Sequence, residues 1–204
     1  GSHNIGIGAE TLGLNTPGNY NIAFGYFAGR APSSTTNNVW IGKCVAAENA
    51  VTGVENIAIG CHAMCKASSG SNNIALGRAA MGAANVTGQH NIAIGQNAGC
   101  STTGAFYNVL FGLNAGKSIE GGGQNILLGA CAGCSITGGA GNVILGGTAG
   151  RSTTGTCNII LGLGSGKSIG GHNHNIFIGT YAACAQSVGN CNIAIGCKVS
   201  LPIS

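Results

Sequence analysis

A five-residue unit, Asn-Ile-x-Ile-Gly, recurs twelve times along the 204 residues of this chain and constrains its fold more than any other feature. Eight of the eleven spacings between successive units are 17 residues, two are 18 and one is 16. So short and regular a period is typical of a solenoid, in which each repeat forms one coil stacked on the last. We therefore expect an all-β parallel β-solenoid (β-roll) of about twelve 17-residue coils. The asparagine that opens each unit lies at positions 4, 21, 38, 56, 73, 91, 108, 125, 142, 158, 175 and 192.

The repeat leaves almost no sequence outside it, so we assign residues 4–204 to a single β-solenoid repeat domain. Residues 1–3, Gly-Ser-His, resemble the scar of an expression tag and are left out of that domain. Because a repeat begins directly at Asn4, we expect the chain to be a fragment of a longer protein.

The composition argues against several functional classes. Charged residues make up only 6% of the chain and the net charge of +4 comes from scattered bases, so no nucleic-acid partner is expected. Glycine and asparagine interrupt every apolar stretch, so no membrane insertion is expected. A high glycine content can indicate disorder, but 44% apolar residues on a strict period favour a packed rod.

Each coil, numbered from its asparagine, carries apolar residues on both faces of a short strand. Positions 2 and 4 are Ile, Val, Leu or Phe in all twelve copies and share one face. Position 3 points the other way, yet it includes Trp40, Leu110 and Phe177. A lone rod with position 3 in water would expose a long apolar stripe, which is typical of an interface, so we expect a parallel homotrimer with one strand face toward the partners. The alternative is a wider single-chain coil whose other side covers position 3.

Positions 1 and 5 are interpreted as structural. Asparagines stacked in register about 4.8 Å apart can hydrogen-bond one to the next and cap the turn before each strand, with ligand binding as the alternative role. The invariant glycine at position 5 indicates a sharp turn with positive φ or a close backbone approach. The ladder asparagines are Asn56, Asn73, Asn91, Asn108, Asn125, Asn142, Asn158 and Asn175, and the turn glycines are Gly60, Gly77, Gly95, Gly112 and Gly129.

The motif Asn-Ile-Ala-Ile-Gly followed by x-x-Ala-Gly resembles the left-handed β-roll heads of trimeric autotransporter adhesins. It is more similar to the Asn-x-Ala-Ile-Gly and Thr-Thr-Gly-x-x-Asn repeats of bacteriophage and giant-virus tail or surface fibres, above all in residues 91–108. The resemblance covers residues 4–200, although the 17-residue period differs from the shorter adhesin-head repeat. It implies a non-enzymatic structural or adhesive shaft segment of a surface fibre, extracellular or on the virion. It also implies a homotrimer and a host-surface glycan or protein as receptor.

Ten cysteines recur at particular coil positions. Cys44 and Cys61 occupy nearly equivalent places in adjacent coils, so a disulfide between them is geometrically reasonable. Cys131 and Cys134 have the spacing of a redox or metal-binding pair, but no second pair follows at zinc-finger distance. Free, small apolar side chains are the simpler interpretation.

His172 and His174 form the one histidine pair with metal-ligand spacing. Residues at i and i+2 share a strand face, and three parallel chains would bring six imidazoles around one axis, which suits a transition metal. Because the pair occurs once and falls in a turn segment, polar turn residues are the simpler interpretation. No cofactor is expected.

An enzyme is not expected. The chain has no aspartate, which excludes a Ser-His-Asp triad and an aspartate-bearing calcium loop. Of its four glutamates only Glu48 and Glu55 could lie near one another, both in one irregular insertion between Gly42 and Asn56, which leaves little for paired-carboxylate chemistry such as that of a β-helical polysaccharide lyase.

Two further functions stay open, an ice-binding β-roll and a carbohydrate-binding β-helix. An ice-binding surface needs a flat, uninterrupted ladder of small polar residues, and thermal hysteresis would reveal it. A glycan array would separate a carbohydrate-binding rod from an inert spacer. The candidate ladder is Thr102, Thr103, Thr137, Thr153 and Thr154, and the interrupting residues are Ile119, Ile136 and Ile169.

Overall fold

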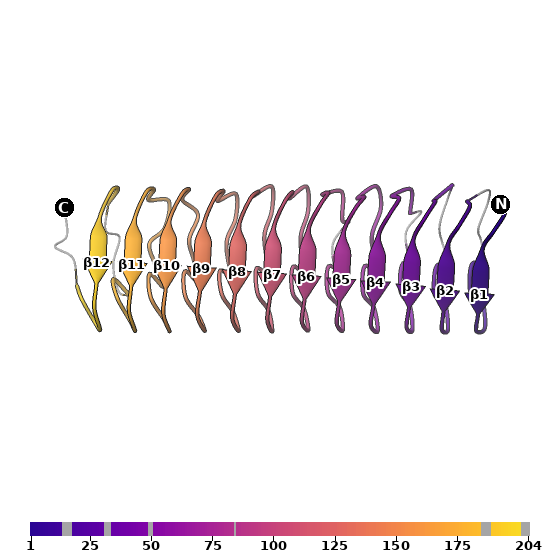
Figure 1. Ribbon diagram of the computed structural model, residues 1–204, viewed down its shortest axis with the longest axis horizontal. Coiled ribbons are helices and arrows are strands. Elements are labelled where there is room, and N and C mark those ends of the chain that lie inside the picture. The colour runs from indigo at the N-terminus through magenta and orange to yellow at the C-terminus, as the bar shows by residue number, and fades with distance from the viewer. Residues whose placement is uncertain (14–17, 31–33, 49–50, 84, 185–188, 201–204) are drawn as a thin grey trace.

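The computed structural model is a rod of stacked coils with the first strand at one end and the last strand at the other (Figure 1). It describes all residues except 14–17, 31–33, 49–50, 84, 185–188 and 201–204. Twelve strands lie side by side in chain order in one parallel sheet, which confirms the predicted β-solenoid. No helix in the described ranges is long and apolar enough to cross a membrane. The strands are β1 (Ile5–Ile7), β2 (Ile22–Phe24), β3 (Val39–Ile41), β4 (Ile57–Ile59), β5 (Ile74–Leu76), β6 (Ile92–Ile94), β7 (Val109–Phe111), β8 (Ile126–Leu128), β9 (Val143–Leu145), β10 (Ile159–Leu161), β11 (Ile176–Ile178) and β12 (Ile193–Ile195).

Every strand pairs with the next in the same register, so like coil positions form columns along the rod. Ile92 of β6, for example, pairs with Val109 of β7. The same register holds across the 18-residue step from Val39 to Ile57 and the 16-residue step from Val143 to Ile159. The turn segments therefore absorb the length differences. At about 4.8 Å per strand the sheet extends about 53 Å.

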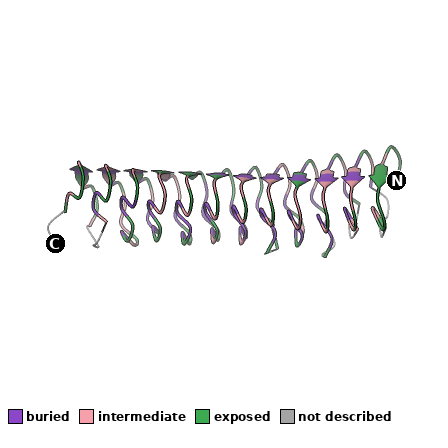
Figure 2. Cartoon of the chain, turned by 90° about the horizontal axis from the view of Figure 1, so that it is seen from below, coloured by how far each residue is buried: buried purple, intermediate pink, exposed green. Residues whose placement is uncertain are grey.

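The interior of the coil lies behind position 3 of each strand. Trp40, Leu110 and Phe177 are all at most 1% exposed. The apolar stripe that the sequence analysis assigned to an interface is therefore the core, and the alternative of a coil covering its own position 3 is what the structure shows. The physical reason is that the remaining segments fold back over this face and bring the small residues of position 8, such as Ala98 and Ala115, into the same interior. Figure 2 shows the sheet along one side of the rod and the turn segments on the other.

Positions 3 and 9 complement each other in volume. Beside Ala58 of β4 and Ala75 of β5, position 9 is a buried methionine, Met64 or Met81. Beside Ala23 of β2 and Ala93 of β6, position 9 is Gly29 or Gly99, and the side chain that fills the space is Trp40 or Leu110 of the following coil. Where position 3 is Leu127, position 9 is Gly133, and a Cβ on that glycine would lie 2.9 Å from the leucine. The interior is thus filled in each case, as a close-packed core requires.

The coil closes through residues in the left-handed conformation. His90, the last residue of its coil (φ 57°), Asn97 at position 7 (φ 55°) and Met81 at position 9 (φ 48°) are examples. Backbone hydrogen bonds join the coils at these corners as well as in the sheet, as between Asn114 N–H and the carbonyl of Gln96 (2.9 Å). The backbone N–H and C=O groups at these corners are therefore hydrogen-bonded without a second continuous sheet on the turn side of the rod.

Candidate functional site

The outer face of the sheet is an apolar strip made by positions 2 and 4. This face points away from the core, so its branched side chains stay accessible along the whole rod: Phe111 is 54% exposed, and Ile193 and Ile195 at the last strand are each 65% exposed. Sequence reasoning expected both strand faces to be buried, but within a single chain only position 3 is. We call these two columns the sheet face. Its members that are more than a third exposed are Ile5, Ile7, Ile57, Ile59, Val109, Phe111, Ile126, Leu128, Leu145, Ile159, Ile193 and Ile195.

The asparagines of position 1 form a buried column immediately before the strands. Asn108 is typical: its N–H and its Nδ2 both donate to Oδ1 of Asn91, at 3.1 and 2.9 Å. The same Nδ2 also donates to the carbonyl of Gly122 at 3.0 Å. Asn125 then uses Oδ1 of Asn108 in the same way. These side-chain amides are occupied by one another and by the backbone, and every asparagine of the column from Asn21 to Asn175 is buried, so these members are not accessible to a ligand.

The glycines of position 5 stand where successive coils come closest. Gly112 has φ +136°, and a Cβ placed on it would come within 2.6 Å of the carbonyl oxygen of Gly129. Gly60, Gly77 and Gly95 have the same conformation and the same close neighbour in the following coil. Both a positive φ and a close approach therefore require glycine at this corner.

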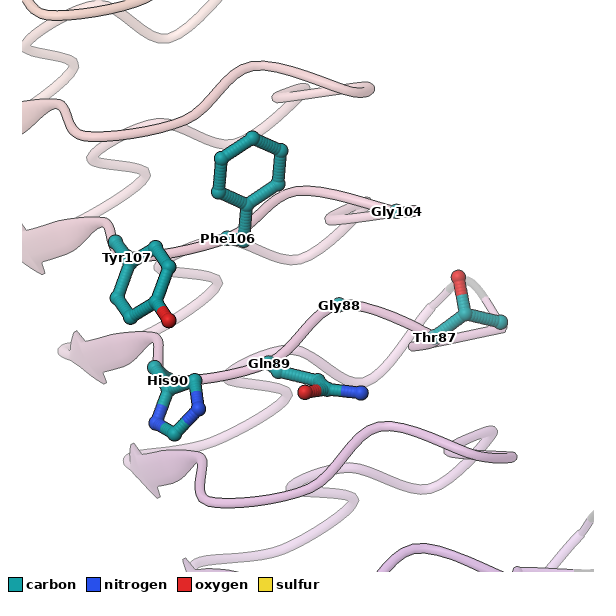
Figure 3. Close-up of a pocket in the computed structure, with 7 residues that line it drawn as sticks. All are labelled: Thr87, Gly88, Gln89, His90, Gly104, Phe106 and Tyr107. Atoms are coloured by element: carbon teal, nitrogen blue, oxygen red, sulfur yellow. The ribbon is translucent and has the colours of Figure 1, made fainter.

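An aromatic cavity of about 310 Å³ lies beside the loops that lead into β6 and β7 (Figure 3). His90 and Tyr107 stack with 4.9 Å between ring centroids and 5° between planes. Phe106 meets Tyr107 edge-on at 5.9 Å. The sequence analysis did not predict this site. The signal that could have found it is the adjacent pair Phe106 and Tyr107 with His90 17 residues earlier, because the repeat places residues 17 positions apart next to each other. The cavity is lined by Thr87, Gly88, Gln89, His90, Gly104, Phe106 and Tyr107.

The cysteines are free thiols in the structure. Cys44 and Cys61 are half-buried and are not joined to each other. Cys61 Sγ lies instead 3.0 Å from Nδ1 of the adjacent His62. Burial, followed by a hydrogen bond to Glu48, raises the pKa of Cys65 to about 12, so this thiol stays protonated at neutral pH.

Cys131 and Cys134 share a second cavity, of about 240 Å³, with the cations Lys117 and Arg151. Burial raises the pKa of Cys134, and the neighbouring Cys131 raises it further, against a smaller lowering by Arg151. Since the thiolate is the reactive form of cysteine, this environment does not activate Cys134.

The histidine pair is not gathered into a metal site. His172 is half-buried and His174 is exposed, with φ +58° at position 17. Within the described residues no three His, Cys, Asp or Glu side chains come close enough to hold a metal ion.

The threonine ladder is divided between interior and surface. Thr102 and Thr153 lie buried at position 12, the column that also contains Ile119, Ile136 and Ile169. The isoleucines are therefore core residues. The exposed column is position 13, where Thr103, Glu120, Thr137, Thr154 and Gly170 follow one another.

Compared with protein-family models, curated proteins and solved structures, the chain matches none of them.

Proposed function

We propose that this chain is a non-enzymatic, structural and adhesive shaft segment of a viral or bacterial surface fibre, assembled as a parallel homotrimer through its sheet face. The observation that carries the proposal is the uninterrupted apolar strip along the outer side of all twelve strands. A stacked parallel solenoid is suited to a shaft because it extends by repetition and pairs its strands along its whole length.

The size of the sheet face supports association. A three-residue strand spans about 10 Å and twelve strands span about 53 Å, so the face covers roughly 530 Å². That is near the upper end of the apolar patches found on monomers, about 300–600 Å². Two such faces in contact remove about 1,060 Å² from water, at the threshold of about 1,000 Å² for a specific interface.

Further copies of this chain fit the face best. The strip repeats with the strand spacing along the whole rod, and only another rod of the same period and length presents matching columns throughout. The column of position 2 on one copy can pack against the column of position 4 on the next, a head-to-tail arrangement that closes around an axis parallel to the rods. This geometry favours a parallel trimer.

The acidic residues support a non-catalytic role. Glu10 pairs with Arg30 at 3.4 Å and Glu48 with Lys66 at 3.8 Å, both at the surface. Such pairs are typical of solvated faces and contribute little to stability. Glu55 and Glu120 lie in different parts of the rod, so these two carboxylates do not pair.

Light scattering coupled to size exclusion tests the assembly. The native chain of 19.9 kDa is expected to elute as a trimer of about 60 kDa, three times the chain mass. The variant Phe111→Thr/Leu128→Thr, which keeps strand propensity but removes apolar area from the sheet face, is expected to raise the trimer dissociation constant at least tenfold. The control is Leu163→Thr, which changes a residue 50% exposed outside the sheet face and should leave the mass unchanged. A native monomer at tens of micromolar, or an unchanged double variant, would contradict the proposal.

A further inference from the structure

We propose that the cavity beside Phe106 and Tyr107 binds a neutral saccharide ring. This inference goes beyond the shaft function and stands on a different part of the surface: the lining residues lie on the loops that precede β6 and β7, not on the sheet face. The cavity volume, about 310 Å³, is at the small end of the range for ligand pockets, about 300–1,000 Å³, and suits one or two sugar rings.

The aromatic rings offer the apolar part of such a site. Phe106 and Tyr107 are 44% and 56% exposed, so both rings are accessible to a ligand. The two rings stand at 90° to each other, and His90 holds the Tyr107 ring by stacking on it. A pyranose ring has an apolar face of C–H groups, and aromatic faces with their negative quadrupole attract such groups. A corner of two perpendicular rings can thus hold one sugar in a defined orientation.

Phe106 departs from the use of its column in other coils. Position 16 commonly carries a polar side chain that accepts a hydrogen bond from the backbone of the preceding coil. Asn19 Oδ1 accepts from Ser2 N–H at 2.7 Å, and Ser71 Oγ accepts from Val54 N–H at 3.0 Å. Phenylalanine cannot accept this bond. The next coil accommodates its ring with Gly123, where a Cβ would lie 2.6 Å from the ring.

Because position 16 is phenylalanine here rather than a polar residue, hydrogen-bond donors beside the cavity are left without an acceptor within the described part of the chain. The N–H of Gln89, which a polar side chain at Phe106 would cap, has no acceptor among the residues that the structure describes. The side-chain amide of Gln89 likewise bonds to no described residue, and Figure 3 shows it extending along the loop toward Thr87. An unpaired backbone donor beside a free amide and a hydroxyl matches the hydroxyl-rich rim of a sugar, which both donates and accepts.

The lining also determines the class of sugar. It contains no Asp, Glu, Lys or Arg, so no charged side chain in it pairs with a carboxylate or a sulfate group. Polar recognition rests on neutral donors and acceptors from Thr87, Gln89, His90 and Tyr107. We therefore infer a neutral hexose or N-acetylhexosamine at the end or branch of a glycan.

Saturation-transfer difference NMR with free sugars tests the site on the whole chain. The probes are glucose, galactose, mannose and N-acetylglucosamine at millimolar concentration, with N-acetylneuraminic acid as the acidic comparison. At least one neutral probe is expected to give a saturation-transfer signal, and the acidic probe a signal at least fivefold smaller. Phe106→Ser, which installs the residue found at the same place as Ser71, is expected to reduce the neutral-sugar signal at least tenfold.

Tyr20→Ser is the matched control. Tyr20 stacks on His3 as Tyr107 does on His90, with 4.7 Å between centroids, but the residue before it is Asn19 rather than phenylalanine. This variant should keep the sugar signal, and unchanged circular dichroism of both variants shows that they fold. The proposal is overturned if no neutral probe binds, if the acidic probe binds best, or if Phe106→Ser and Tyr20→Ser behave alike. None of these results depends on the trimer, which light scattering tests separately.

Discussion

Each asparagine of the position 1 column from Asn21 to Asn158 uses its side-chain amide fully. One Nδ2 hydrogen goes to the preceding asparagine and the other to a backbone carbonyl, and Oδ1 receives two donors from the following asparagine. A buried amide satisfied in this way stabilises one geometry, because any displaced member leaves several polar groups unpaired. This explains at residue scale why the position does not vary among the twelve coils.

Asn108→Ala is expected to lower the free energy of unfolding by about 3 kcal/mol or more, since the Gly122 carbonyl and two donors of Asn125 lose their partner in a buried site. Asn97→Ala is the control, because Asn97 lies at a half-buried corner and its side chain makes a single bond to Asn114. Urea denaturation measures both. Equal losses in the two variants would show that the column does not act as described.

Cys65 makes stability depend on alkaline pH. Its pKa is about 12 in the fold and about 8.5 in an unfolded chain. The contribution of this thiol is complete below pH 8.5 and is lost as pH rises toward 12, because only the unfolded chain ionises in that window. At pH 10.5 the loss is about 2 kcal/mol relative to pH 8.

Urea denaturation of the reduced protein at pH 8 and pH 10.5 measures this loss. Cys65→Ala should lose less stability between the two pH values, and alanine is compatible with the site because Ala47 occupies the same position one coil earlier. If Cys65→Ala loses as much free energy of unfolding between pH 8 and pH 10.5 as the native chain does, Cys65 is not the source of the pH dependence.

At the scale of the element, several coils balance the volume of the strand residue at position 3 against that of the turn residue at position 9. Leu127 fills the space that Gly133 leaves, whereas Ala58 is accompanied by Met64. The pairing lies across the interior, six residues apart in the chain, so it cannot be recognised from strand patterning alone. The pairing can be recognised only from the tertiary structure, in which the strand and the turn segment face each other across the interior of the coil.

Leu127→Ala is expected to destabilise the rod by about 3 kcal/mol through the cavity it creates. In an Ile136→Ala background, which removes the side chain nearest to Gly133, adding Gly133→Met should recover at least 1 kcal/mol, because methionine fills that space as Met64 does between Ala58 and Ala67, and Met64 shows that it tolerates the left-handed conformation there (φ 45°). Gly133→Met alone should destabilise, since its side chain would meet Leu127 and Ile136. Urea denaturation of the single and combined variants gives a thermodynamic cycle, and from it the coupling free energy between positions 127 and 133. Additive changes in the free energy of unfolding would show that the two side chains do not compensate for each other in volume.

At the scale of the whole molecule, the rod is a sum of nearly equivalent coils. Contacts run almost entirely between neighbours, and each strand touches only the strands before and after it. Stability of such an array is the sum of intrinsic and nearest-neighbour contributions. One coil can therefore be removed if the register of the others is kept.

Deletion of residues 125–141, one complete 17-residue coil, is expected to give a folded rod in which Asn142 takes the place of Asn125 beside Asn108. Deletion of residues 125–133 should not fold normally, because it breaks the period. Circular dichroism and thermal unfolding compare the two. Native-like unfolding of the shorter deletion, or failure of the longer one, would show that register is not what holds the coils together.

The sequence by itself was sufficient for the parallel solenoid, the number of strands and their register. A strict period forces like residues into columns, and twelve identical asparagines and glycines leave one alignment that satisfies them all. It was not sufficient to say which strand face is inside. Alternation shows that positions 2 and 4 oppose position 3, but both are apolar here, so hydrophobicity cannot distinguish them.

Only the tertiary structure decided that question, because the answer depends on the side to which the turn segments fold back. Left-handed residues at the corners carry the chain over position 3 and leave positions 2 and 4 uncovered. The same closure places Phe106 and Tyr107 at the surface beside Gln89 of the preceding coil. Residues about 17 positions apart in sequence become neighbours across one coil spacing, and this stacking creates both the sheet face and the aromatic cavity.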